Sequence, residues 1–78
     1  MTAMIHNLTK MLAAGQDNAL LRYSLGTAYL KSGDYLQARE HLARAVAHDP
    51  HYSAAWKHYA QVLTQLGLRD EASAAYRE

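Results

Sequence analysis

The chain has 78 residues, a length that allows one small domain at most. Eight Lys and Arg residues stand against seven Asp and Glu residues, and the resulting net charge of +1 lacks the strongly basic balance of nucleic-acid-binding proteins. The absence of cysteine excludes disulfide bonds and thiolate-ligated metal sites, and no apolar run is long enough to cross a membrane. The N-terminus lacks the charged and apolar regions of a secretory signal, so we expect a cytoplasmic protein.

The first predicted element is a helix within residues 1–15 that ends at Gly15. Apolar side chains recur here every three or four positions, which places them on one face of a helix. This stripe consists of Met4, Ile5, Leu8, Met11 and Leu12. The segment is either the second helix of a repeat whose first helix is missing or a capping helix peculiar to this chain. In both cases we interpret its methionines as packing residues.

The second predicted helix spans residues 19–31, with Asp17 or Asn18 as its N-cap. Four apolar residues share one face of it: Leu21, Leu25, Ala28 and Tyr29. Gly26 lies beside this face, although a glycine inside a helix costs about 1 kcal/mol relative to alanine. We therefore expect a neighbouring helix to approach closely at Gly26, where no side chain would fit.

A tight connection leads to a third predicted helix over residues 35–48. Gly33 has the place of a left-handed residue after a helix, and Asp34 is an N-cap followed three residues later by Gln37. A connection this short predicts an antiparallel hairpin. The expected apolar stripe is Leu36, Ala38, Leu42, Ala45 and Val46. Pro50 prevents the helix from continuing.

A fourth helix is predicted over residues 54–66, after a linker at 49–52. Ser53 is its expected N-cap, and Gly67 ends it. A fifth helix is expected to begin near Arg69.

The order of these residues resembles the tetratricopeptide repeat (TPR). The matching residues are Leu25-Gly26-x-x-Tyr29, Ala38-x-x-x-Leu42, Ala45 and Pro50. Two positions depart from the family signature, because Arg22 stands in place of its Trp and Leu42 in place of its Phe. A second copy lies 34 residues further on, where Arg22 corresponds to Trp56, Ala38 to Ala72 and Leu42 to Tyr76.

The resemblance implies an all-α fold of tandem antiparallel helix hairpins, a short right-handed superhelical solenoid of about two and a half TPR units. Residues 1–15 would be the N-terminal capping helix or half-repeat, 19–52 the first full repeat, and 53–78 a second repeat truncated at its C-terminus. Solenoids of this kind usually need about three repeats for stability, so we expect modest stability.

The resemblance also implies a non-catalytic protein–protein interaction module without cofactors. The first helix of each pair would line a concave face that binds a peptide or helix of another protein. The residues carried over by position are Tyr23, Thr27, Leu30, Lys31, Lys57, His58, Gln61 and Gln65. The alternative for this face is a solvated polar surface without a ligand. Some family members hold a chaperone's C-terminal carboxylate with Lys and Asn residues, a pattern that Lys57 and Gln61 match only in part.

The main alternative function is a structural one, and the sequence supports two further functions less well. Self-association through the terminal helices, at Met4–Leu12 or Ala72–Tyr76, would make a homodimer or a longer array. RNA binding needs a basic face, for which only Lys31 and Lys57 are candidates. The sequence contains no nucleophile elbow, no phosphate-binding loop and no cysteine, so we expect that the protein is not an enzyme.

The five histidines predict no metal site. They are His6, His41, His48, His51 and His58. His48 and His51 flank the proline, but a pair without a third ligand is a weak zinc signal. We interpret the histidines as surface residues near the negative ends of helix dipoles.

Overall fold

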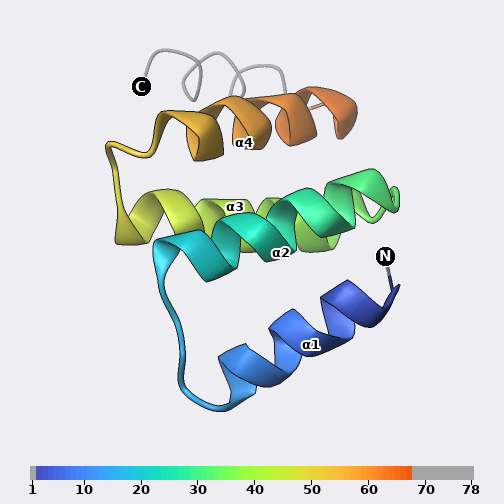
Figure 1. Ribbon diagram of the computed structural model, residues 1–78. Helices are drawn as coiled ribbons and strands as arrows, with labels where there is room; N and C mark the ends of the chain where they lie inside the picture. The colour runs from blue at the N-terminus through green and yellow to red at the C-terminus, as the bar shows by residue number, and fades with distance from the viewer. Residues whose placement is uncertain (1, 68–78) are drawn as a thin grey trace.

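The computed structural model describes residues 2–67, which form four helices and contain no strand (Figure 1). These are α1 (Thr2–Ala13), α2 (Ala19–Lys31), α3 (Tyr35–His48) and α4 (Ser53–Gln65). The all-α prediction is confirmed. The expected fifth helix near Arg69 lies outside the described residues, as do Ala72 and Tyr76 of the second copy.

α2 and α3 form the predicted antiparallel hairpin, and its turn has the predicted residues. Gly33 has a φ of 82°, a left-handed conformation that glycine adopts without strain. The N–H groups of Gly33 and Asp34 donate to the carbonyl oxygens of Leu30 and Tyr29, at 3.2 and 3.0 Å, which closes the end of α2. The Asp34 carboxylate then accepts the N–H of Gln37 at 3.3 Å and begins α3.

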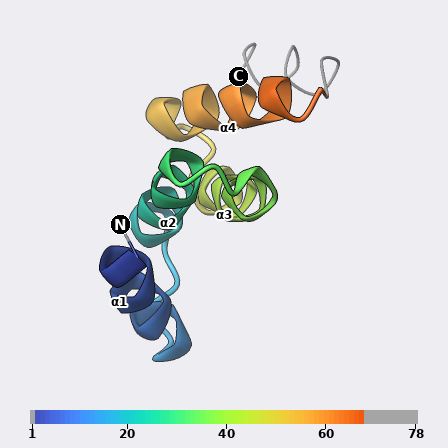
Figure 2. The same cartoon turned by 90° about the vertical axis from the view of Figure 1, so that its right-hand side faces the viewer.

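The two helices of the hairpin meet at Gly26, as the sequence predicted. A Cβ at this position would lie 2.5 Å from Cγ of Leu42, so only glycine fits without a shift of the Leu42 side chain or of α3. Leu42 is fully buried and lies in one cluster with Ala38 of α3 and Val62 of α4. α4 therefore packs across the hairpin and contacts both of its helices (Figure 2).

Two predictions about exposed and buried apolar residues are wrong. Leu36 is 70% exposed rather than part of the α3 stripe, because it lies two residues before Ala38 and therefore about 200° around the helix from it. Met4 and Met11 are 47% and 41% exposed, so they are not fully packed core residues. Among the described helices α1 contacts α2 alone, which leaves part of its apolar stripe uncovered.

The start of α4 also differs from the prediction, since Ser53 is the first helical residue and not the N-cap. Tyr52 is the cap residue, and its side chain makes no capping hydrogen bond. Its ring lies 4.9 Å from the ring of Tyr23, and the Trp56 indole donates to the Pro50 carbonyl oxygen at 2.7 Å. Aromatic packing thus sets where α4 begins.

Arg22 stands where the family signature has Trp, and its guanidinium group forms a network of polar contacts there. Asn18 is the N-cap of α2, whereas Asp17 accepts two hydrogen bonds from the Arg22 guanidinium, at 2.8 and 3.0 Å. The Asp17 carboxylate is also 3.0 Å from Nε2 of His48. The guanidinium holds the pKa of Asp17 well below its usual range, and Asp17 raises the pKa of Arg22.

His41 completes this network and is buried, so its interpretation as a surface histidine is wrong. Its Nδ1 accepts from Nη1 of Arg22 at 3.1 Å, and its ring stacks on Tyr29 with centroids 5.4 Å apart. Desolvation lowers the pKa of His41, and the positive charge of Arg22 lowers it further. The network needs the neutral ring, because a protonated Nδ1 would place an N–H against the guanidinium.

Stability is expected to rise with pH through the range just below the ordinary histidine pKa of about 6.5. Because folding lowers the pKa of His41, the unfolded chain binds more protons in this range, and each pH increase favours the folded state. Urea unfolding between about pH 5 and pH 8 measures the slope. A His41→Gln variant, which keeps a side chain able to accept from Arg22, should show a smaller slope. Equal slopes for the two proteins would contradict this account.

Candidate functional site

A hollow of about 300 Å³ lies between α2 and α4, with the start of α3 closing one side. We call it the α2–α4 groove. Its lining residues are Thr27, Leu30, Lys31, Tyr35, His58, Gln61 and Gln65. Six of the eight residues proposed from sequence for the concave face are among them, and the structure brings these six together.

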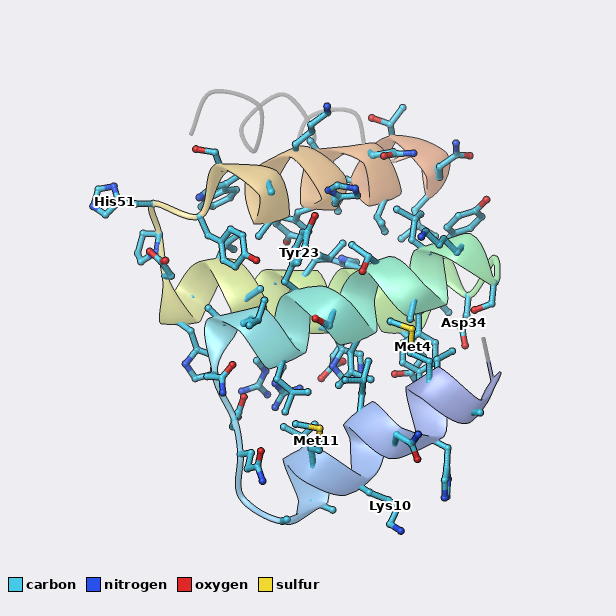
Figure 3. All side chains as sticks on the ribbon, viewed as in Figure 1. Met4, Lys10, Met11, Tyr23, Asp34 and His51 are labelled. Carbon is cyan, nitrogen blue, oxygen red and sulfur yellow. The ribbon has the colours of Figure 1, made fainter. Side chains whose placement is uncertain are left out.

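The other two proposed residues lie outside the lining. Lys57 is exposed on α4. Tyr23 rises from α2 towards α4 and is half-buried (Figure 3). Its ring packs 4.9 Å from Tyr52 and meets the His58 ring edge-on at 5.4 Å, so Tyr23 holds the two helices together beside the groove.

Tyr35 is the lining residue that sequence reasoning missed. It is the first residue of α3, whereas the sequence argument took residues only from the first helix of each pair. The signal that could have found it is the hairpin turn, since a turn of three residues puts the start of α3 next to the end of α2, where Leu30 and Lys31 lie.

The polar groups of the groove can be assigned donor and acceptor roles. Nδ1 of His58 is 2.8 Å from the Ala54 carbonyl oxygen, which can only accept, so we assign the proton to Nδ1. In the neutral ring Nε2 is then an acceptor. The Thr27 hydroxyl donates to the Ser24 carbonyl oxygen at 3.0 Å and keeps its lone pairs. The amides of Gln61 and Gln65 supply both donors and acceptors.

Charge in the groove has one sign. Lys31 contributes an ammonium group, and none of the described lining residues is a carboxylate. The groove thus offers alternating hydrogen-bonding groups, an apolar side chain in Leu30, a phenol in Tyr35 and one cation. This chemistry suits the backbone and side chains of an extended peptide.

A second hollow, of about 430 Å³, lies on the other side of α3. Its lining residues are Leu36, Arg39, Glu40, Ala43, Arg44 and Tyr59. It carries charges of both signs beside the exposed Leu36, and no sequence argument pointed to it.

Residues 2–67 contain neither a candidate metal centre nor a candidate membrane span. Within this part of the chain no three His, Cys, Asp or Glu side chains lie close enough together to hold a metal ion. No helix in the same range is long and apolar enough to span a membrane.

Within residues 2–67 one antiparallel hairpin, α2–α3, has a further helix packed on each side of it, and this arrangement is that of a helical-repeat solenoid. The sequence profile described as a tetratricopeptide repeat matches residues 29–78, which is more than half of the chain. The chain therefore belongs to the tetratricopeptide-repeat family, and the resemblance seen in its sequence is confirmed. TPR repeats generally mediate protein–protein interactions, and proteins of this family are generally non-catalytic scaffolds.

The chain is also similar to a TPR repeat-containing protein of Pseudomonas aeruginosa. The two are 61% identical over 54 residues, which cover 69% of this chain and 51% of the relative. The chain thus spans about half the length of this curated relative.

Proposed function

We propose that this protein is a non-catalytic interaction module that binds an extended segment of a partner protein in the α2–α4 groove. The observation that carries the proposal is the repeated placement of polar residues on the two groove walls. Thr27 and Lys31 of α2 lie one helical turn apart, and Gln61 and Gln65 occupy the equivalent positions of α4, 34 residues later.

This spacing fits an extended backbone. Residues four apart on a helix are separated by about 6 Å along its axis. Two residues of an extended chain advance by about 6.6 Å, so alternate peptide groups of the bound segment can meet successive side chains of one wall. The single cation, Lys31, favours a segment with an acidic side chain at that end.

The first test replaces one residue on each wall by a carboxylate. The variant Thr27→Glu with Gln61→Glu is expected to weaken partner binding by about tenfold or more, because it puts two negative charges beside the segment. Partner proteins are captured from a native lysate and identified by mass spectrometry. Synthetic peptides that tile the captured protein are then titrated against the purified protein by fluorescence anisotropy.

The matched control is Thr9→Glu with Gln16→Glu, which makes the same chemical changes at exposed positions of α1 and its following loop. The control should keep the affinity of the unchanged protein. Equal affinities for the groove variant and the unchanged protein would overturn the proposal, as would equal losses in both variants.

A further inference from the structure

The α2 wall of the α2–α4 groove continues beyond the hollow to Leu20. Leu20 lies seven residues before Thr27 and eleven before Lys31, and both intervals are close to whole turns of a helix. The three side chains therefore form one straight row along α2, with Ser24 between Leu20 and Thr27. Leu20 is 65% exposed, whereas its neighbour Leu21 is buried in the core. The row thus ends in an apolar side chain that faces solvent.

The α4 wall has the same polarity. α4 runs beside α2 in the same direction, from left to right in Figure 1. The 34-residue repeat pairs Leu20 with Ala54 at the N-terminal ends of the two helices and Lys31 with Gln65 at the C-terminal ends. Ala54 is exposed, like Leu20. The groove is therefore apolar at one end and polar, with a cation, at the other.

Tyr23 adds an aromatic ring to the first of these ends. It follows Leu20 by three residues, so the two side chains are neighbours on the surface of α2. The Tyr23 ring is held beside the groove by the Tyr52 ring at 4.9 Å and the His58 ring at 5.4 Å. We call Leu20, Tyr23 and Ala54 the apolar end of the groove.

The charged side chains closest in sequence to the apolar end face elsewhere. Arg22 lies two residues after Leu20, about 200° around the helix, and donates two hydrogen bonds to Asp17. Lys57 corresponds to Tyr23 in the repeat. Since Tyr23 faces α4 from α2, Lys57 lies on the edge of α4 that faces away from α2. Both cations are thus directed away from the apolar end, and Lys31 is the cation of the groove.

The distance between the two ends fixes the spacing of side chains that could reach both. Leu20 and Lys31 are about 16 Å apart along the axis of α2. An extended segment advances about 3.3 Å per residue, so four or five of its residues cover this distance. Helical side chains lean towards the N-terminus, which brings the long Lys31 side chain closer to Leu20 and favours four residues. Side chains four residues apart also point to the same side of an extended segment.

We propose that the segment bound in the α2–α4 groove carries an acidic side chain at Lys31 and, four residues away, a large apolar side chain at the apolar end. This inference rests on the proposed function and adds the chemical class of the partner, an extended acidic–apolar peptide. The carboxylate complements a cation that has no carboxylate among the described lining residues. The apolar side chain covers Leu20, and the polar side chains of Thr27 and Gln61 meet the backbone between the two.

Designed peptides test this spacing. The probes are fluorescent, capped threonine peptides that contain one Glu and one Leu, since threonine favours an extended backbone. They are made with Glu and Leu four or five residues apart and in both orders along the peptide. Fluorescence anisotropy measures their affinities at low salt. In the tighter-binding order, the spacing of four should give about tenfold higher affinity than the spacing of five, because the latter points the two side chains to opposite sides.

Two protein variants assign each side chain of the peptide to one end of the groove. Leu20→Ser should lower the affinity for the spacing-four peptide by about tenfold, but leave the affinity for a peptide with Ser in place of Leu unchanged. Lys31→Gln should lower the affinity by about fivefold, and only for peptides that contain Glu. Leu36→Ser, at an exposed leucine of α3, is the matched control and should change neither affinity. Circular dichroism checks that each variant keeps its helices.

Equal affinities for the two spacings overturn this inference, as do losses that do not depend on the Leu or Glu of the peptide. The partner captured from the lysate separates this failure from that of the proposed function. If Thr27→Glu with Gln61→Glu releases the partner while Leu20→Ser and Lys31→Gln retain it, groove binding stands and the acidic–apolar pattern is wrong. If all three variants retain the partner, both proposals are wrong.

Discussion

Replacement of Leu42 by alanine is expected to lower the free energy of unfolding by about 2–5 kcal/mol. Leu42 is fully buried at the point where α3 meets both α2 and α4, so the substitution leaves a cavity that two helices would have to close. A small repeat domain has a total stability of only about 5 kcal/mol, and a large part of the population should unfold. Urea unfolding followed by circular dichroism measures the loss.

The control for this prediction is Leu36→Ala, the same chemical change six residues earlier on α3. Leu36 is exposed, so its loss should change the free energy of unfolding by about 0.5 kcal/mol or less. Similar losses in both variants would show that the hairpin core is not centred on Leu42.

Replacement of Gly26 by alanine is expected to destabilise the protein by about 1–3 kcal/mol. At an ordinary helical position the same change stabilises by about 1 kcal/mol. Here the new Cβ would lie 2.5 Å from Cγ of Leu42, 2.7 Å from its Cδ2 and 3.3 Å from its backbone nitrogen. Since Cγ lies close to the backbone, either the buried Leu42 side chain must leave its rotamer or α3 must shift. Thermal and urea unfolding measure the effect.

A double-mutant cycle separates this steric cost from a general effect of the substitution. In the Leu42→Ala background most of the obstruction is gone, so Gly26→Ala should cost less there than in the unchanged protein. The combined loss is then smaller than the sum of the single losses. A stabilising Gly26→Ala, or strictly additive losses, would contradict the close contact between α2 and α3.

Local features of this fold were predictable because they depend on residues near one another in the chain. The turn at Gly33 and Asp34 follows from backbone conformation and one capping side chain, and both were predicted correctly. The start of α4 was not, because Tyr52 and Trp56 are held by packing and by the Pro50 carbonyl group rather than by a cap. The burial of His41 was not predicted for a similar reason, because its partners Arg22 and Tyr29 are on another helix.

In the candidate site, too, the features set by local helical spacing were predictable and those set by packing between helices were not. Helical spacing alone gathers Thr27, Leu30 and Lys31 on one face, and the repeat adds their counterparts on α4. Spacing does not show which side chains at the edge of that face are used in packing, so it could not place Tyr23 beside the groove. The role of the six groove residues in binding stays a prediction, which the Thr27 and Gln61 variant tests.

The order of contacts along the chain has a consequence for the speed of folding. Apart from the contact of α2 with α4, each described helix packs against the next one in sequence, so few long loops must close before packing begins. Helical chains with such local contacts fold in microseconds to milliseconds, much faster than sheets built from distant strands. The α2–α3 hairpin, with its short turn and its tight contact at Gly26, is the natural nucleus. α4 and α1 can then add to it from either side, which buries the parts of their apolar stripes that face the hairpin.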